Sequence, residues 1–264
     1  MLRTDDHGRV RLLTLDRPEA LNAFNTALYD TVAEALNEAA ADGDIAVVVL
    51  TGEGRAFSAG QDLGEMADLA GSMGESGGES SDAGHGFPRF MDALIGFPKP
   101  LIAAVNGLGV GLGLTVVGHC DLTLVAESAR FRPPFTALGV VPEAAASYTL
   151  PAMMGWQAAN DVLLTSRWIG ADEAVATGLA LRKVPDADLV PVALALAAEI
   201  AVWPISSLVG TKRVMRAAHS EAVADARRRE DREFAALTGS PANLEALTAF
   251  LEKRPPDFSA IPGE

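Results

Sequence analysis

Two glycine-bearing loops contain the residues whose types and spacing are best suited to chemistry. The first loop spans residues 55–63 (RAFSAGQDL) and follows the apolar run 47–51. The second loop spans residues 105–115 (VNGLGVGLGLT) and follows the apolar run 101–105. A strand, a tight glycine turn and a helix in this order can aim backbone N–H groups at a bound oxygen atom. Two such loops side by side could hold one oxyanion from two directions.

Several other chemistries lack their sequence signatures. The glycines of residues 107–113 alternate as GxGxGxG, so the GxGxxG fingerprint of dinucleotide binding is absent, as are GxxxxGK[ST], HExxH, GxSxG and any cysteine pair. The four histidines are scattered without ligand spacing, at His7, His85, His119 and His219. We therefore expect no metal site and no nucleotide cofactor.

Composition places the chain among globular proteins and narrows its partners. The 264 residues are 49% hydrophobic and 21% charged, which is ordinary for a soluble protein with a sizeable core. The net charge of −14 argues against nucleic acid or an anionic membrane as the main partner. A single cysteine, Cys120, excludes an intrachain disulfide and fits the cytoplasm, where we expect the protein to reside. The apolar run 101–117 is shorter than the roughly 20 residues that span a bilayer.

Hydrophobic periodicity predicts an α/β protein. β-branched or alternating runs predict strands, and helical spacing predicts helices. We expect strands at residues 10–15, 45–50, 101–105 and 121–125, and helices at residues 26–40, 87–95, 114–117, 144–154, 160–164, 171–177, 189–202, 206–218, 221–237 and 243–251. The glycine- and serine-rich residues 71–86 predict a mobile loop, either a lid or a tolerated insertion. A composition shift at residues 203–204 predicts a core of residues 1–203 and a C-terminal helical region of residues 204–264.

The order of several motifs resembles one known family. The segments AFSAGQDL (56–63), KPLIAAVNG (99–107), LGVVP (138–142) and FLEKR (250–254) look like the enoyl-CoA hydratase/isomerase (crotonase) superfamily. The resemblance implies a repeated ββα spiral, with C-terminal helices that build a homotrimer or a dimer of trimers. It also implies an acyl-CoA thioester as substrate, with coenzyme A entering only as part of that substrate.

By the same resemblance, two backbone N–H groups hold the thioester oxygen as it becomes an enolate. Their positions match Gln61 in the first loop and Leu112 in the second. Fixed donors aimed at such an oxygen are worth about 2.7–4 kcal/mol each. The alternative is that the glycines serve only close packing.

Hydratases of the family use two glutamates, and this chain lacks both. Their positions match Thr115 and Phe135, neither of which can act as a base. The two-glutamate mode of hydration is therefore not expected.

Glu143 offers a different acid/base. Residues 131–143 and 147–151 resemble the Δ3,Δ2-enoyl-CoA isomerase branch, in which a glutamate directly after this proline shuttles a proton between C2 and C4 of the substrate. The alternative role is a first-turn acid that complements a helix dipole. Residues 144–146 are all alanine, where the family resemblance leads us to expect more glycine.

Further positions resemble family contacts to the CoA thioester: Ala20, Leu21, Arg55, Ala56, Ser58, Ala59, Asp62, Leu63, Phe135 and Lys253. For Lys253, contact with CoA phosphates and a solvated helix end are equally open. Asp62 and Asp121 are expected to hold loops through backbone hydrogen bonds.

Three functional hypotheses follow. The first is an enoyl-CoA isomerase that uses Glu143 with the Gln61 and Leu112 amides. The second is another crotonase reaction, such as hydration, assisted by an acid from residues 65–68. The third is an acyl-CoA-binding protein without turnover.

Overall fold

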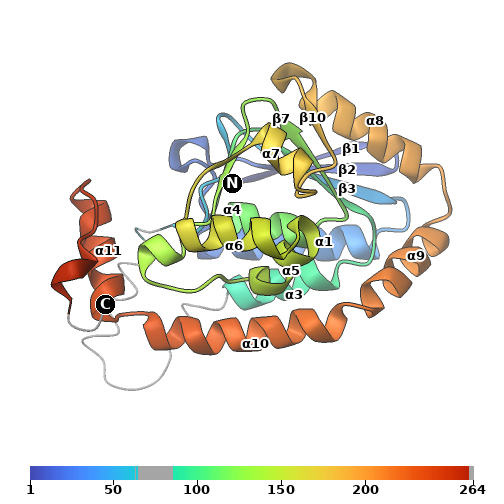
Figure 1. Ribbon diagram of the computed structural model, residues 1–264. Coiled ribbons are helices and arrows are strands. Elements are labelled where there is room, and N and C mark those ends of the chain that lie inside the picture. The colour runs from blue at the N-terminus through green and yellow to red at the C-terminus, as the bar shows by residue number, and fades with distance from the viewer. Residues whose placement is uncertain (63, 65–85, 262–264) are drawn as a thin grey trace.

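The larger of two β-sheets forms the centre of the molecule (Figure 1). The computed structural model describes residues 1–62, 64 and 86–261. The larger sheet has the strand order β1-β2-β3-β5-β7-β10, and its β1–β2 pair is antiparallel whereas the other pairs are parallel. Its strands are β1 (Leu2–His7), β2 (Val10–Leu15), β3 (Val47–Gly52), β5 (Leu101–Val105), β7 (Leu122–Ala126) and β10 (Arg182–Val184). The apolar runs of β3 and β5 are buried throughout, as expected for parallel strands covered on both faces.

In the smaller sheet, three of the four short strands directly follow strands of the larger one. Its order is β4 (Ala56–Ser58), β6 (Leu108–Val110), β8 (Arg130–Arg132) and β9 (Ile169–Gly170). β4 follows β3, β6 follows β5 and β8 follows β7, and helices come after the strand pairs. This repetition is the ββα spiral that the resemblance implied, and it confirms the predicted α/β fold.

Helices cover the larger sheet and the ends of the smaller one. α1 (Thr26–Ala41) packs on α3 (Gly86–Gly96), and α8 (Leu189–Ala201) packs across β2, β3, β5 and β7. The other described helices that precede α9 are η1 (Pro18–Ala20), α4 (Leu112–Thr115), η3 (Val116–His119), η4 (Thr136–Leu138), α5 (Ala146–Met154), α6 (Trp156–Thr165), α7 (Ala171–Ala176) and η5 (Asp186–Asp188).

The C-terminal helices continue around the core. α9 (Ile205–Ala217) leads to α10 (Ser220–Leu237), which runs along the lower edge in Figure 1 and packs on α5. An ion pair of 2.9 Å between Arg227 and Asp92 joins α10 to α3. α11 (Pro241–Leu251) precedes η6 (Phe258–Ala260), and Asn243 Nδ2 donates to Leu138 O at 2.8 Å. The division at residues 203–204 and the trimeric assembly stay predictions.

The predicted strands and long helices are confirmed within one to three residues at most ends, with two corrections. Periodicity predicts no helix or strand within residues 131–142, but these residues include part of β8 and all of η4. The helix expected from residue 144 begins at Ala146, because Ala144 and Ala145 adopt φ values of 61° and 59° that no right-handed helix contains. Most of the predicted loop 71–86 lies outside the described residues.

Among the described residues, no single helix is long and apolar enough to cross a bilayer. The bent pair Asp186–Ala201 and Ile205–Ala217, with 102° between its halves, meets that test by length and composition only.

Close backbone packing makes Gly107 a test of the fold. A Cβ atom at Gly107 would lie 2.2 Å from Arg55 O, whereas a Cβ atom at Gly96 would meet nothing within 4 Å. We expect Gly107→Ala to lower the free energy of unfolding by about 1–3 kcal/mol, because backbone must move to admit the methyl group. Gly96→Ala should stay within about 0.5 kcal/mol of wild type. Urea denaturation of both variants measures the difference, and equal midpoints would contradict this packing.

Candidate active site

The two glycine-bearing loops lie against each other at backbone distance. A Cβ atom at Gly60 would lie 2.7 Å from Val110 O and 3.4 Å from Leu112 N. A Cβ atom at Gly113 would lie 2.2 Å from Ser58 O. Only glycine fits both positions, so the loops meet through their main chains. These glycines therefore allow close packing, and the same packing brings the Leu112 amide beside the first loop.

The N–H groups of both predicted oxyanion donors lack an acceptor among the described residues. Gln61 forms a one-residue parallel bridge with Phe24, in which Phe24 N donates to Gly60 O at 2.7 Å and Asp62 N donates to Phe24 O at 2.9 Å. The Gln61 N–H therefore points to the other side of the bridge. Leu112 is the first residue of α4, where an N–H has no intrahelical partner. In the described part of the chain, neither N–H donates a hydrogen bond.

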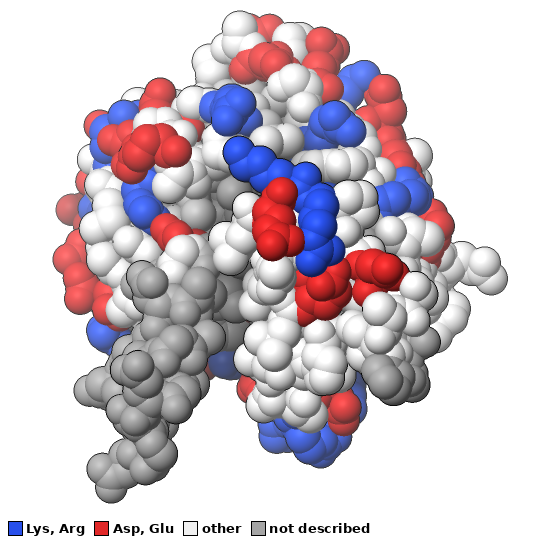
Figure 2. All heavy atoms as spheres, turned by 90° about the vertical axis from the view of Figure 1, so that its left-hand side faces the viewer, with Lys and Arg blue, Asp and Glu red and all other residues white. Residues whose placement is uncertain are grey.

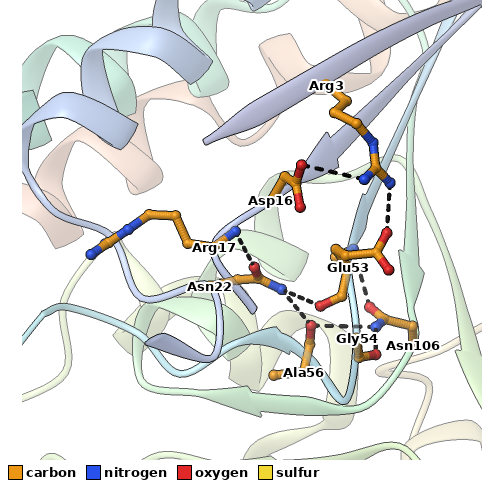
Figure 3. A network of polar contacts seen from close by, with 9 residues as sticks. Arg3, Asp16, Arg17, Asn22, Glu53, Gly54, Ala56 and Asn106 are labelled. Carbon is orange, nitrogen blue, oxygen red and sulfur yellow. Dashed lines mark hydrogen bonds and ion pairs between the residues drawn. The ribbon is translucent and has the colours of Figure 1, made fainter. Parts of the chain in front are cut away.

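A buried asparagine holds the turn at residues 17–22 against the start of the first loop (Figure 3). Asn22 is fully buried, its Nδ2 donates to Glu53 O at 2.9 Å and to Ala56 O at 2.7 Å, and its Oδ1 accepts from Arg17 N at 2.9 Å. Asn106 Nδ2, from the second loop, also donates to Ala56 O at 3.3 Å. Two side-chain amides thus tie both loops to the turn at residues 17–22.

The same turn pairs with the first loop through its backbone. Ala59 N donates to Leu21 O at 2.9 Å, and Ser58 Oγ donates to Asn22 O at 2.8 Å. Ala20 and Ala59 are half-buried, as is Leu21, whose φ is 53°. The structure therefore brings these predicted substrate contacts together. Because the Ser58 hydroxyl is buried and bonded to protein, it cannot readily serve a ligand.

Asp62 holds the loop, as predicted for a structural carboxylate. Its Oδ2 pairs with Arg17 Nη2 at 3.2 Å, and its Oδ1 accepts from Gly64 N at 3.2 Å. The Arg55 side chain is exposed beside this region. Leu63, another predicted contact, lies outside the described residues.

Glu143 stands immediately before a left-handed turn. Ala144 and Ala145 both have positive φ, a conformation that costs an L-residue roughly 1–2 kcal/mol. This turn explains why glycine was expected at these positions. It also separates Glu143 from α5, so Glu143 is not a first-turn acid of that helix.

The Glu143 carboxyl group is desolvated and acidic neighbours face it. Glu143 is half-buried, and no hydrogen bond or ion pair reaches its side chain from the described residues. Desolvation, followed by the charges of Glu230 and Asp231, raises the pKa of Glu143 from 4.5 to about 7. A carboxyl group with this pKa can both accept and donate a proton near neutral pH.

Two buried side chains hold the turn after Glu143. Glu230 Oε2 accepts from Ala145 N at 2.6 Å and Oε1 accepts from Ser147 N at 2.7 Å. On the other side, His119 Nε2 donates to Ala144 O at 2.6 Å. Burial lowers the pKa of His119 to about 4, so the ring is neutral with its proton on Nε2. Sequence reasoning missed the role of Glu230, because a glutamate on a charged helix gives no local signal of burial.

The two positions matched to hydratase glutamates hold no acid. Thr115 is fully buried in α4, and Leu112 O lies 3.4 Å from its hydroxyl, a weak hydrogen bond at best. Phe135 is buried at the start of η4. Any proton transfer at this site therefore has to use another group.

Basic side chains that could bind a polyanionic ligand are scattered and do not form one patch on the face in Figure 2. Figure 2 shows basic and acidic side chains interspersed on one face, without an extended patch of one sign. Lys253 follows α11 and is exposed, and no ion pair to it is found in the described residues. Its contact with CoA phosphates stays a prediction. No cluster of potential metal ligands occurs among residues 1–62, 64 and 86–261.

The loop geometry and the ββα repeat coincide with a known family. The sequence profile of the family described as enoyl-CoA hydratase/isomerase matches residues 5–260. The chain belongs to the enoyl-CoA hydratase/isomerase family. It is therefore an enzyme of the crotonase superfamily, as the motifs around the two loops indicated.

Relatives within the enoyl-CoA hydratase/isomerase family carry different activities in their names. The chain is 36% identical to 2,3-dehydroadipyl-CoA hydratase of Escherichia coli K12, with 95% of each chain covered. It is 33% identical to 1,2-epoxyphenylacetyl-CoA isomerase of the same strain, again with 95% of each covered. A crystal structure of an enoyl-CoA hydratase/isomerase from Pseudoalteromonas atlantica T6c superposes with a TM-score of 0.89 at 38% identity, covering 97% of this chain and 99% of the other.

The raised pKa of Glu143 predicts a pH-dependent effect on stability. Between pH 4.5 and 7 the folded state binds more protons at Glu143 than the unfolded state, so this group lowers stability as pH rises. We expect Glu143→Gln to exceed wild type in unfolding free energy by about 1–2 kcal/mol at pH 8, after allowance for partial solvent access, and by much less at pH 5. Urea denaturation at both pH values tests this. A difference independent of pH would place the Glu143 pKa near its ordinary value.

Proposed function

We propose that this chain is a Δ3,Δ2-enoyl-CoA isomerase with Glu143 as its single acid/base. The observation that carries the proposal is the Glu143 carboxyl group, whose pKa is raised to about 7 on a strained turn, in a chain without acids at residues 115 and 135. Moving a double bond needs one group that takes a proton and returns it. Adding water across the bond in the family's usual way needs two carboxylates.

The proposed reaction begins with the thioester carbonyl oxygen between the Gln61 and Leu112 N–H groups. Glu143 removes a proton from C2 of a 3-enoyl-CoA, and the electron pair of that C–H bond forms an enolate whose negative charge rests on the carbonyl oxygen. Glu143 then delivers the proton to C4. The electron pair of the C3–C4 double bond forms the new C4–H bond, the enolate oxygen re-forms the carbonyl group, and the C2–C3 double bond results. Glu143 is then again a carboxylate, as at the start.

The energies involved favour separate roles for the two amides and for Glu143. The two amides are fixed before the reaction and point at the atom where charge develops, which is worth about 2.7–4 kcal/mol per donor. A base with a pKa near 7 is strong enough to remove the C2 proton and weak enough to release it. Buried Phe135 adds an apolar wall that excludes water from the carbanion.

In the same proposal, coenzyme A lies along the first loop. Its contacts would come from Ala20, Leu21, Arg55, Ala56, Ala59 and the backbone near Asp62, with Lys253 reaching a phosphate. The assembly would be a homotrimer or a dimer of trimers in the cytoplasm. Exposed apolar side chains on α9 and α11 support such contacts between subunits; they are Val214, Met215, Leu244, Phe250 and Leu251.

Hydration is the second candidate function, because the related E. coli enzyme is named a 2,3-dehydroadipyl-CoA hydratase. The assisting acid that we considered for it, within residues 65–68, lies outside the described residues. Binding of acyl-CoA without turnover is the third hypothesis, and the same assay addresses it.

Glu143→Gln is the direct test of the isomerase proposal. With a 3-enoyl-CoA substrate, the variant should lose at least about 100-fold in kcat, because an amide cannot accept the proton, while KM changes little. Glu34→Gln, an exposed glutamate on α1, is the matched control and should retain wild-type kcat.

Chromatographic detection of both 2-enoyl-CoA and 3-hydroxyacyl-CoA separates the candidates. Isomerisation that survives in Glu143→Gln would remove Glu143 from the mechanism. Formation of 3-hydroxyacyl-CoA from a 2-enoyl-CoA, at a rate unchanged by the substitution, would favour hydration. Binding without either product would leave the non-catalytic hypothesis.

A further inference from the structure

We propose that Glu230, on the C-terminal helix α10, is a positioning residue that holds the catalytic Glu143 in place through the backbone of the turn between Glu143 and α5. The inference rests on the proposed function, because it gives Glu143 the catalytic role. Glu230 lies 87 positions beyond Glu143 in the chain, so the link exists only in the folded molecule.

The contact is bidentate and buried. Only 4% of the Glu230 surface is exposed, and its two carboxylate oxygens accept from Ala145 N at 2.6 Å and Ser147 N at 2.7 Å. Each oxygen has its own donor, so both the distance and the orientation of the turn are fixed. Such charge-assisted bonds are roughly twice as strong as bonds between neutral groups.

The turn needs an external restraint. Two successive alanines in the left-handed region are disfavoured, and such conformations persist only where the surroundings impose them. Glu230 restrains the N–H side of the turn, and His119 Nε2 restrains it at Ala144 O. If the Glu230 restraint is lost, Ala144 and Ala145 are free to relax toward negative φ, which would rotate the Glu143 side chain away from its position.

Glu230 also serves as the acid at the start of α5, a role that sequence analysis had considered for Glu143. The helix begins at Ala146, and the N–H groups of its N-cap residue Ala145 and of Ser147 donate to the Glu230 carboxylate. Burial raises the pKa of Glu230, while the bonds from Ser147 and Ala145 lower it. The helix dipole adds to the stabilisation of the charged form.

The charge on Glu230 acts on Glu143 as well as on the turn. Both Glu230 and Asp231 of α10 oppose ionisation of Glu143. The other polar groups around the turn are neutral His119 on η3, Tyr148 on α5, whose hydroxyl contacts His219 Nδ1 at 2.6 Å, and Arg227, which pairs with Asp92. Removal of the Glu230 charge should therefore let Glu143 ionise at lower pH.

The pH dependence of isomerisation tests the inference on the full-length enzyme. For wild type, kcat/KM should rise with pH through a midpoint near 7, as the base ionises. Glu230→Gln keeps the side-chain shape but loses the charge and one acceptor. We expect its midpoint to fall by about half to one pH unit. We also expect its kcat to fall about 10- to 100-fold with little change in KM, because the base is displaced.

Two further variants separate positioning from charge and from general stability. Glu230→Asp keeps the charge but is one methylene shorter, so the midpoint should stay near that of wild type while kcat falls. Glu233→Gln removes an exposed carboxylate from the same helix and should match wild type in both quantities. If Glu230→Gln does not fold, Glu230→Asp decides the matter through its kcat.

The outcomes distinguish the two proposals. Undiminished isomerisation in Glu143→Gln would overturn the proposed function and this inference with it. An inactive Glu143→Gln enzyme, together with a Glu230→Gln enzyme that keeps the wild-type midpoint and kcat, would overturn the role of Glu230 alone. An unchanged kcat in Glu230→Asp would overturn the positioning role.

Discussion

The close approach of the two glycine-bearing loops is the constraint on which the rest of the site depends. Gly60 lies against Val110 O and Leu112 N, and Gly113 lies against Ser58 O, at distances that leave no room for a side chain. The loops meet through their main chains, and the N–H groups of Gln61 and Leu112 have no acceptor among the residues that the structure describes. Donors held in this way need no reorganisation when charge appears on a bound oxygen atom.

A continuous helical segment links the proposed oxyanion site to the turn that carries the proposed acid/base, Glu143. α4 and η3 form one helical segment from Leu112 to His119, about 12 Å long at a rise of 1.5–2.0 Å per residue. The segment begins with the Leu112 amide and ends with the imidazole that bonds Ala144 O. A helix from the far end of the chain supplies the opposing contact through Glu230. The turn that carries Glu143 is thus held between two elements.

Sequence patterns predicted the elements with strong periodicity and missed those that depend on partners. The runs of β3 and β5 and the amphipathic α1 carry their own signals. Strands such as β4 and β6 have three residues each and form because a neighbouring repeat offers a backbone ladder. The start of α5 was misplaced, since alanine gives no warning of a positive φ.

In the candidate site, too, residues within motifs were predicted, and a residue that depends on tertiary packing was missed. The roles of Gln61, Leu112 and Glu143 were predicted from their positions within motifs. Within the described residues the two N–H groups lack acceptors and the carboxyl group is desolvated, as the proposed roles require. Glu230 could not be identified in this way. Its local sequence is that of a charged surface helix, and only the packing of α10 on α5 buries it.

The proposed mechanism depends on the protonation behaviour of the Glu143 side chain. Carboxyl ¹³C NMR of protein labelled at glutamate, with Glu143 assigned by its absence from the Glu143→Gln spectrum, measures that behaviour directly. A Glu143 signal that titrates with a midpoint near 7 is the predicted result. A midpoint near the ordinary glutamate value of about 4.3 would contradict a desolvated acid/base at this position.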